Sequence, residues 1–186
     1  ENLVSIIIPS FNRYNQLIHA IQSIKNQTYK NTEIIVVDDG SDDINYNEKI
    51  DGVTLINLAE KNSRKVLGYP CGGYVRNIGL KIAKGEYIAF LDDDDYWLPQ
   101  KLEVQVDILK KQKHFLATCS DAFLSQKIIN TSNTDNLVEY NKVFWWDRIS
   151  KILGIENDYP HKITKKLLYK HNTIITSSML FKKELI

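Results

Sequence analysis

The feature that most constrains the fold is a set of short β-branched apolar runs, each followed at once by polar residues. Leu3 to Ile8, Glu33 to Val37 and Tyr87 to Leu91 are too short for typical helices, and their composition predicts buried strands. A weaker strand is predicted from Val53 to Leu58. Strands that alternate with helices predict an α/β fold, with helices flanking a mainly parallel sheet.

The predicted helices lie between these runs, where apolar residues recur at intervals of three and four. Their apolar faces are Tyr14, Leu17, Ile18, Ile21 and Ile24; then Val75, Ile78, Gly79, Ile82 and Ala83; then Leu98, Leu102, Val106 and Leu109. Gly85 is placed to end the second helix, and Pro99 fits the first turn of the third. The polar segment 60–74, rich in glycine, predicts a loop.

Each of the three strongest strands ends in residues suited to binding a ligand. The first is followed by Pro9, Ser10, Phe11, Asn12 and Arg13, the second by Asp38 and Asp39, and the third by Asp92, Asp93, Asp94 and Asp95. Ligands of parallel sheets bind beyond the carboxyl ends of the strands. We therefore expect the three clusters to meet at one edge of the sheet.

The run from Asp92 to Asp95 is electrostatically costly, because neighbouring carboxylates raise one another's pKa unless a cation offsets their charge. Mg²⁺ and Mn²⁺ prefer such oxygen ligands, and often combine one or two carboxylates with substrate phosphates. If strand geometry continues, Asp92 and Asp94 point to the same side. The alternative is a solvated turn with acids before the helix at Pro99.

The other candidates also have two readings. Arg76, in the first turn of a helix after the glycine-rich loop, is placed to bind phosphate, or is a surface arginine. Asp38 and Asp39 can accept hydrogen bonds from a base or a ribose, or form a turn with Gly40 and Ser41.

Composition excludes several classes of protein. A net charge of +1 gives no basic excess for nucleic acid. The chain has no phosphate-binding P-loop and no dinucleotide-binding glycine motif, and Cys71 and Cys119 form no metal-binding pair. No run approaches the roughly 20 apolar residues of a membrane helix. We expect a cytoplasmic protein without a transmembrane segment, and leave peripheral contact with the inner face of the membrane open.

The second part of the chain is patterned less clearly. Strands are predicted at 115–124, 127–129 and 173–181, a loop at 130–141, a helix at 143–153 and the start of another at 182–186. We divide one continuous domain into two halves, 1–112, which carries the three polar clusters, and 113–186, which we expect to be truncated at its C-terminus.

Four blocks in order carry a resemblance to glycosyltransferase family 2, which has the GT-A fold, a Rossmann-like sheet. They are VSIIIPSFNR (Val4 to Arg13), EIIVVDDGSDD (Glu33 to Asp43), VRNIGLKIAKGEYIAFLDDDD (Val75 to Asp95) and YWLPQKL (Tyr96 to Leu102). The resemblance is dense over residues 3–110. It continues thinly to ITSSMLFKKEL (Ile175 to Leu185). The resemblance implies that residues 1–112 are a nucleotide-sugar-binding half and that residues 113–186 are a partial acceptor-side half.

The resemblance implies an inverting transfer of a sugar from a nucleotide diphosphate donor, by family frequency a UDP-sugar, to a glycan or lipid-linked acceptor. It implies that residues 9–13 line the nucleotide pocket, that Asp39 contacts the base with Asp38 beside it, and that Arg76 stands near the base or phosphates. Asp92 and Asp93 are assigned to the nucleotide, and Asp94, with Asp92, to Mn²⁺ or Mg²⁺.

An inverting transfer also needs a general base for the acceptor hydroxyl. In the family this acid follows the strand that resembles Ile175 to Phe181, so we expect it beyond Ile186. The chain's own acids in this region match no such motif: Asp121, Glu139, Asp147, Glu156 and Asp158. Two alternatives stay open, namely a nucleotide-sugar-binding fragment with weak or no activity and a divalent-cation-binding interaction domain.

Overall fold

A computed structural model describes residues 2–120, 122–124, 138–139 and 174–186 of the chain. The chain divides into two compact units. One comprises Glu1–Thr118 with Met179–Ile186, and the other comprises Cys119–Ser178. The first unit holds all the strand ends that the sequence marks as a site, so the description below concerns it.

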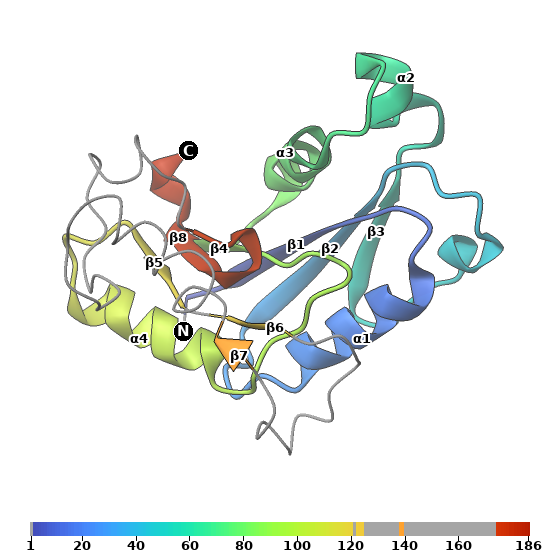
Figure 1. The fold of residues 1–186 in the computed structure, drawn as a ribbon. Coiled ribbons are helices and arrows are strands. Elements are labelled where there is room, and N and C mark those ends of the chain that lie inside the picture. The colour runs from blue at the N-terminus through green and yellow to red at the C-terminus, as the bar shows by residue number, and fades with distance from the viewer. Residues whose placement is uncertain (1, 121, 125–137, 140–173) are drawn as a thin grey trace. The chain divides into compact units, whose positions relative to one another are not determined.

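Within the described residues, six strands form one sheet in the order β3-β2-β1-β4-β8-β5 (Figure 1). The strands are β1 (Val4–Ser10), β2 (Thr32–Asp38), β3 (Val53–Asn57), β4 (Tyr87–Phe90), β5 (Ala117–Cys119) and β8 (Met179–Lys182). β1 pairs in parallel with β2 and β4, and β2 with β3. β8 runs antiparallel to β4. The predicted mainly parallel α/β sheet is confirmed.

Helices cover both faces of this sheet (Figure 1). α1 (Tyr14–Lys25) and α4 (Lys101–Lys111) lie on one face, and α3 (Gly72–Ile82) lies on the other. Side chains alternate along β1, so Ile6 and Ile8 pack with the first pair of helices while Ile7 packs with α3. Both faces of β1 are therefore buried, which is why its sequence is continuously apolar rather than alternating.

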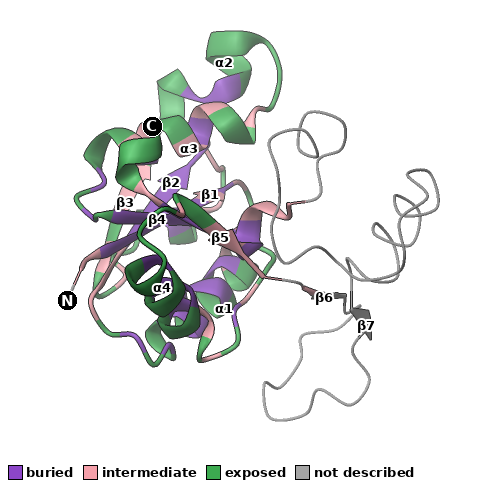
Figure 2. Ribbon diagram, turned by 90° about the vertical axis from the view of Figure 1, so that its left-hand side faces the viewer, coloured by how far each residue is buried: buried purple, intermediate pink, exposed green. Residues whose placement is uncertain are grey.

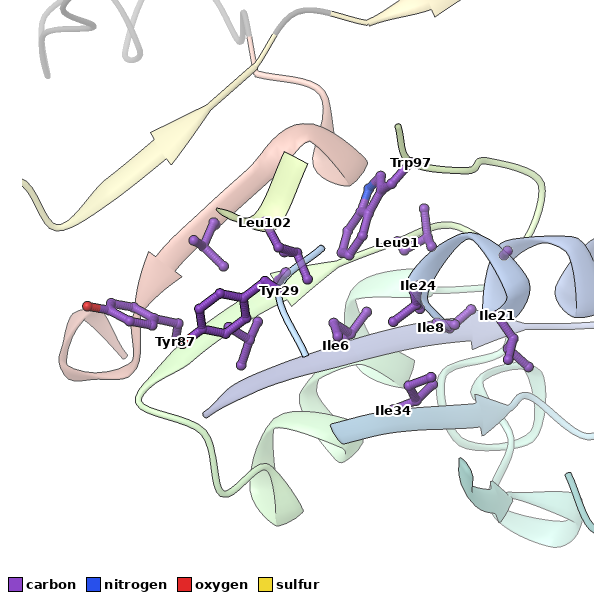
Figure 3. Close-up of a cluster of buried hydrophobic side chains, with 14 of the residues drawn as sticks. Ile6, Ile8, Ile21, Ile24, Tyr29, Ile34, Tyr87, Leu91, Trp97 and Leu102 are labelled. Atoms are coloured by element: carbon purple, nitrogen blue, oxygen red, sulfur yellow. The ribbon is translucent and has the colours of Figure 1, made fainter. Parts of the chain in front are cut away.

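The larger core cluster forms under α1 and α4. Figure 3 shows Ile6 and Ile8 of β1 beside Ile24, Leu102 and Trp97, which come from the two helices and the segment before α4. Burial is concentrated in this core and along the central strands, while the outer helix surfaces are exposed (Figure 2).

Several predicted boundaries are wrong. The segment 60–74, predicted as a loop, holds the 3-10 turn η2 (Ala59–Lys61), the short helix α2 (Ser63–Leu67) and the start of α3. Asn62 makes this helix possible, because its side chain accepts a hydrogen bond from the Lys65 amide and caps the first turn. β1 also continues through Pro9 to Ser10, and α4 begins only at Lys101.

The later elements are shorter than predicted. The strand expected at 173–181 begins at Met179, after the 3-10 turn η4 (Thr176–Ser178), and the helix expected at 182–186 is the 3-10 turn η5 (Lys183–Leu185). The strand expected at 115–124 is split into β5 and β6 (Phe123–Leu124), and β7 (Val138–Glu139) lies within the predicted loop. The predictions for 127–129 and 143–153 lie outside the described residues.

Candidate functional site

The ends of β1 and β4 are joined through the carboxylate of Asp93. Ser10 Oγ donates a hydrogen bond to Asp93 Oδ2 at 2.8 Å, and the Phe11 amide approaches the same oxygen at 3.4 Å. Arg13 Nη1 lies 3.2 Å from the other oxygen, Asp93 Oδ1. These contacts link residues about 80 positions apart and bring together the first and third polar clusters, as the sequence predicts.

Asp93 is nearly fully buried, and burial raises the pKa of its carboxyl despite the hydrogen bond from Ser10 and the charge of Arg13. The carboxylates of Asp94 and Asp93 in turn raise the pKa of Arg13, so this guanidinium stays charged. Asp93 therefore anchors the end of β1 and the segment after it, because Ser10, Phe11 and Arg13 all donate to its carboxylate.

Asp92 and Asp94 face outward from this anchor, and each meets an arginine. Asp92 forms an ion pair with Arg76 of α3, and Asp94 Oδ2 lies 2.6 Å from Arg13 Nη1. The Asp94 side chain is 51% exposed and that of Asp92 35%, against 8% for Asp93. The strand does not continue into this run: β4 (Tyr87–Phe90) ends before it, and the Asp95 amide donates to the Asp92 carbonyl at 3.1 Å, which closes a turn. The expected strand alternation is therefore wrong, and the turn itself separates one buried acid from two more accessible ones.

Arg76 reaches the site across the first turn of α3. Its guanidinium carbon lies 5.8 Å from the centroid of the Phe90 ring. Among the described residues, its Nε is the buried side-chain polar atom that has no hydrogen-bond partner. A Cβ on Gly72 would lie 3.0 Å from Arg76 Nη1, so the glycine leaves room for the arginine.

The two acids at the end of β2 have different surroundings. Asp38 is fully buried. The Ser41 amide lies 3.0 Å from its Oδ1 and 3.2 Å from its Oδ2, and the Ser41 hydroxyl also donates to Oδ1. Burial raises the pKa of Asp38, and the Ser41 hydrogen bonds oppose that rise. Asp38 thus shapes the turn through Gly40, whose φ is 80°, and its contact with a nucleotide stays a prediction.

Asn12 connects this turn to the first cluster. Its amide donates to Ser41 Oγ at 2.8 Å, and its side-chain oxygen accepts from the Asp42 amide at 2.9 Å. Asn12 adopts a φ of 52°, a left-handed conformation that asparagine tolerates better than most residues. The loops after β1 and β2 are therefore fixed side by side.

Asp39 contacts residues that the sequence interpretation did not single out. Its Oδ1 accepts from the Ser63 amide at 2.6 Å, its Oδ2 accepts from the Ser63 hydroxyl, and Arg64 Nη1 lies 3.6 Å from Oδ2. Ser63 is fully buried and also accepts from the Cys71 amide at 3.0 Å. The segment Asn62-Ser63, a capping pattern before a short polar helix, is the signal that was available in the sequence.

Tyr46 is a second residue that the sequence interpretation missed. It lies in the 3-10 turn η1 (Ile44–Asn47), and its buried hydroxyl lies 2.5 Å from Ser10 Oγ and accepts from the Arg13 amide at 3.1 Å. Because Ser10 has one proton and donates it to Asp93, Tyr46 must donate to Ser10. Burial raises the pKa of Tyr46, so its hydroxyl remains protonated.

The segment after the acidic run is held by side chains from α1 and the residues after it. The buried amide of Gln27 donates to the Leu98 carbonyl at 2.8 Å and accepts from the Leu102 amide at 3.0 Å. Ser23 Oγ accepts from the Trp97 amide at 3.1 Å. These bonds fix the segment from Trp97 to Leu102, which follows the turn that carries Asp94.

The residues at this edge of the sheet fit a divalent cation only if a bound diphosphate supplies part of the ligand set. In the part of the chain that the structure describes, no cluster of three or more His, Cys, Asp or Glu side chains could hold a metal. The accessible carboxylates of Asp94 and Asp92 would supply one or two oxygen ligands, and a bound diphosphate would supply others, which is a common arrangement for Mg²⁺.

The mainly parallel sheet with its flanking helices has the GT-A fold, which its structural neighbours share. A family model described as "Glycosyl transferase family 2" matches residues 5–186. The chain belongs to glycosyltransferase family 2.

Similar proteins include the Escherichia coli enzyme UDP-Glc:alpha-D-GlcNAc-diphosphoundecaprenol beta-1,3-glucosyltransferase WfaP, which is 39% identical over 117 residues. That alignment covers 62% of this chain and 44% of WfaP. The chain thus matches less than half the length of this relative.

Solved structures that share the fold include the following two. S. aureus TarS 1-349 in complex with UDP-GlcNAc has a TM-score of 0.59 at 21% identity, covering 98% of this chain and 46% of that one. The mannosyltransferase PcManGT from Pyrobaculum calidifontis, in complex with GDP-Man and Mn2+, has a TM-score of 0.52 at 23% identity. The match covers 64% of this chain and 35% of PcManGT. None of the helices in the described residues is long and apolar enough to cross a bilayer.

Proposed function

We propose that this chain is the donor-binding part of an inverting glycosyltransferase that uses a UDP-sugar and a divalent cation and acts on a lipid-linked glycan acceptor. The observation that carries the proposal is the meeting of Asp39, Arg76 and Asp94 at the edge where β1, β2 and β4 end. Asp93 joins the ends of β1 and β4 there, and Ser63 holds Asp39. These groups are of the kinds that a nucleotide diphosphate requires, which supports the proposal.

Each part of the donor has a suitable partner. Phe11 offers an aromatic face to the base, and Asp39 offers a carboxylate that can accept from a base N–H. Arg76 and Arg13 carry positive charge beside the accessible acids, where a diphosphate would lie. A divalent cation held by Asp94 and Asp92 would offset the charge that grows on the leaving diphosphate.

The arginines would do chemical work beyond binding. As the bond from the sugar to the diphosphate breaks, negative charge accumulates on the diphosphate oxygens. Arg76 is positioned by α3 and by its ion pair with Asp92, so its charge is in place before the bond breaks. Among the described residues we assign none as the general base that accepts the acceptor proton.

The name of one relative supports the proposed acceptor and location. WfaP is named for a diphosphoundecaprenol-linked acceptor and for UDP-Glc. A lipid-linked acceptor is confined to a membrane, so we extend the proposal to a protein that works at the cytoplasmic face of a membrane.

The test is the binding of UDP by calorimetry, with and without Mn²⁺, to the wild type and to two variants. Asp94→Asn should weaken Mn²⁺-dependent UDP binding by about tenfold or more, because an amide is a poor ligand for the cation. Asp95→Asn removes the neighbouring exposed charge and is the matched control, which should stay within about twofold of the wild type.

Three results would count against the proposal or narrow it. Unchanged Mn²⁺-dependent binding in Asp94→Asn refutes the assignment of the metal ligand. No metal-dependent binding of UDP by the wild type, with tight binding of Mn²⁺ alone, points instead to a cation-binding interaction domain. Binding of UDP without transfer or hydrolysis of a UDP-sugar points to a nucleotide-sugar-binding module.

A further inference from the structure

Arg64 of α2 contacts both groups that we assign to the base of the donor. Its guanidinium carbon lies 3.9 Å from the centroid of the Phe11 ring, which is a stacking distance. Its Nη1 lies 3.6 Å from Asp39 Oδ2. One planar, donor-bearing side chain therefore covers an aromatic face and stands beside a carboxylate, as a nucleotide base would.

The backbone at Arg64 is held by the two residues before it. Ser63 is buried and bonded to Asp39 through both its amide and its hydroxyl, and Asn62 caps the helix. Arg64 follows directly, so the start of α2 directs it to the end of β2. The rest of α2 is exposed, as Figure 2 shows, and Gly68 ends it with a φ of 81°.

We propose that Arg64 occupies the base-stacking face of Phe11 and must leave it when a nucleotide binds, so that Arg64 sets the affinity of the base subsite. The inference rests on the proposed function. A guanidinium 3.9 Å from the ring centroid leaves no room for a second planar group on the same face. A base that stacks there has to replace the arginine.

The contacts of Arg64 are weak enough to be replaced. Its side chain is 43% exposed, and an ion pair at 3.6 Å in contact with water contributes little. The cation–π contact at an exposed site is also modest. Asp39 keeps its two hydrogen bonds from Ser63 when Arg64 moves, so the carboxylate stays in place for the base.

The experiment compares UDP binding by calorimetry, with Mn²⁺ present, in the wild type, Arg64→Ala and Lys65→Ala. Lys65 is the next residue of α2, half exposed and paired with Glu60, so its removal deletes the same charge without touching Phe11. We expect Arg64→Ala to tighten UDP binding about twofold to fivefold, the range that one exposed cation–π contact gives. Lys65→Ala should not tighten it.

A double variant separates the stacking contact from the lost charge. With Phe11→Leu as background, the tightening caused by Arg64→Ala should largely disappear, because the ring for which arginine and base compete is gone. Unchanged or weaker UDP binding in Arg64→Ala overturns the inference, since the arginine would then be neutral or a partner of the nucleotide. If the wild type does not bind UDP at all, the proposed function itself fails.

Discussion

The hydroxyl of Ser10, the last residue of β1, donates a hydrogen bond of 2.8 Å to the buried carboxylate of Asp93, which lies three residues after the end of β4. Tyr46 donates to the same hydroxyl from η1. Ser10 is thus the point where three separate segments meet, and it sets the position of the acids on either side of Asp93.

Replacing Ser10 by alanine should weaken both folding and donor binding. The change removes the acceptor of Tyr46 and one donor to Asp93, and leaves buried polar groups unpaired at a cost of about 1–3 kcal/mol. Because Asp93 anchors the segment that carries Asp94, Mn²⁺-dependent UDP binding should weaken several-fold. Urea unfolding and calorimetry measure the two effects.

Ser5→Ala is the control for that variant. Ser5 is also fully buried on β1, and its hydroxyl donates to Glu33 and accepts from the Gly85 amide, but it lies at the other end of the strand. The Ser5→Ala substitution should lower the free energy of unfolding and leave the affinity for UDP unchanged. Equal losses of affinity in the two variants would show that Ser10 acts only through global stability.

Asp38 should make stability depend on pH in a definite direction. Burial raises the pKa of Asp38 in the folded state above its unfolded value, so the folded protein binds the proton more tightly. Its contribution to stability is therefore present at low pH and is lost as pH rises through the folded pKa. Relative to Asp38→Asn, the wild type should gain stability as pH falls from 7 towards about 4.

Urea unfolding of both proteins across that pH range measures the difference. Asp42→Asn removes an exposed acid a few residues along the same loop and should show no comparable trend. A stability difference between wild type and Asp38→Asn that does not change with pH would contradict the prediction.

Gly79→Ala should destabilise the protein although alanine favours helices. A Cβ at this position in α3 would lie 2.5 Å from Ile7 Cγ2 and 3.3 Å from Val37 Cγ2, so the helix or the strands must shift. Overpacking of this kind costs roughly 1–3 kcal/mol. Thermal or urea unfolding measures the loss.

Gly73→Ala tests the opposite case in the same helix. Its Cβ would meet only Cys71 Sγ at 3.9 Å, so helix propensity should dominate and stability should stay equal or rise by up to about 1 kcal/mol. If both substitutions stabilise, then α3 does not pack on β1 and β2 as closely as described.

Much of the fold could be predicted because it depends on local sequence patterns. Continuous apolar runs predict strands buried on both faces, and β1, β2 and β4 lie where those runs are. The parallel arrangement then places the ends of these strands at one edge, so the meeting of Ser10, Asp39 and Asp93 followed from topology. The boundaries within 60–74 did not follow, because a five-residue helix capped by Asn62 has no apolar periodicity.

What the sequence by itself determined is the kind of residue at each strand end: the acids from Asp92 to Asp95, the pair Asp38 and Asp39, and Arg76. Only the tertiary structure decided which acid is buried and which faces outward. Asp93 is buried because Ser10, 83 residues earlier, donates to it, and Asp39 is held by Ser63, 24 residues later. A carboxylate is accessible or enclosed according to the donors that surround it, and those donors come from distant parts of the chain.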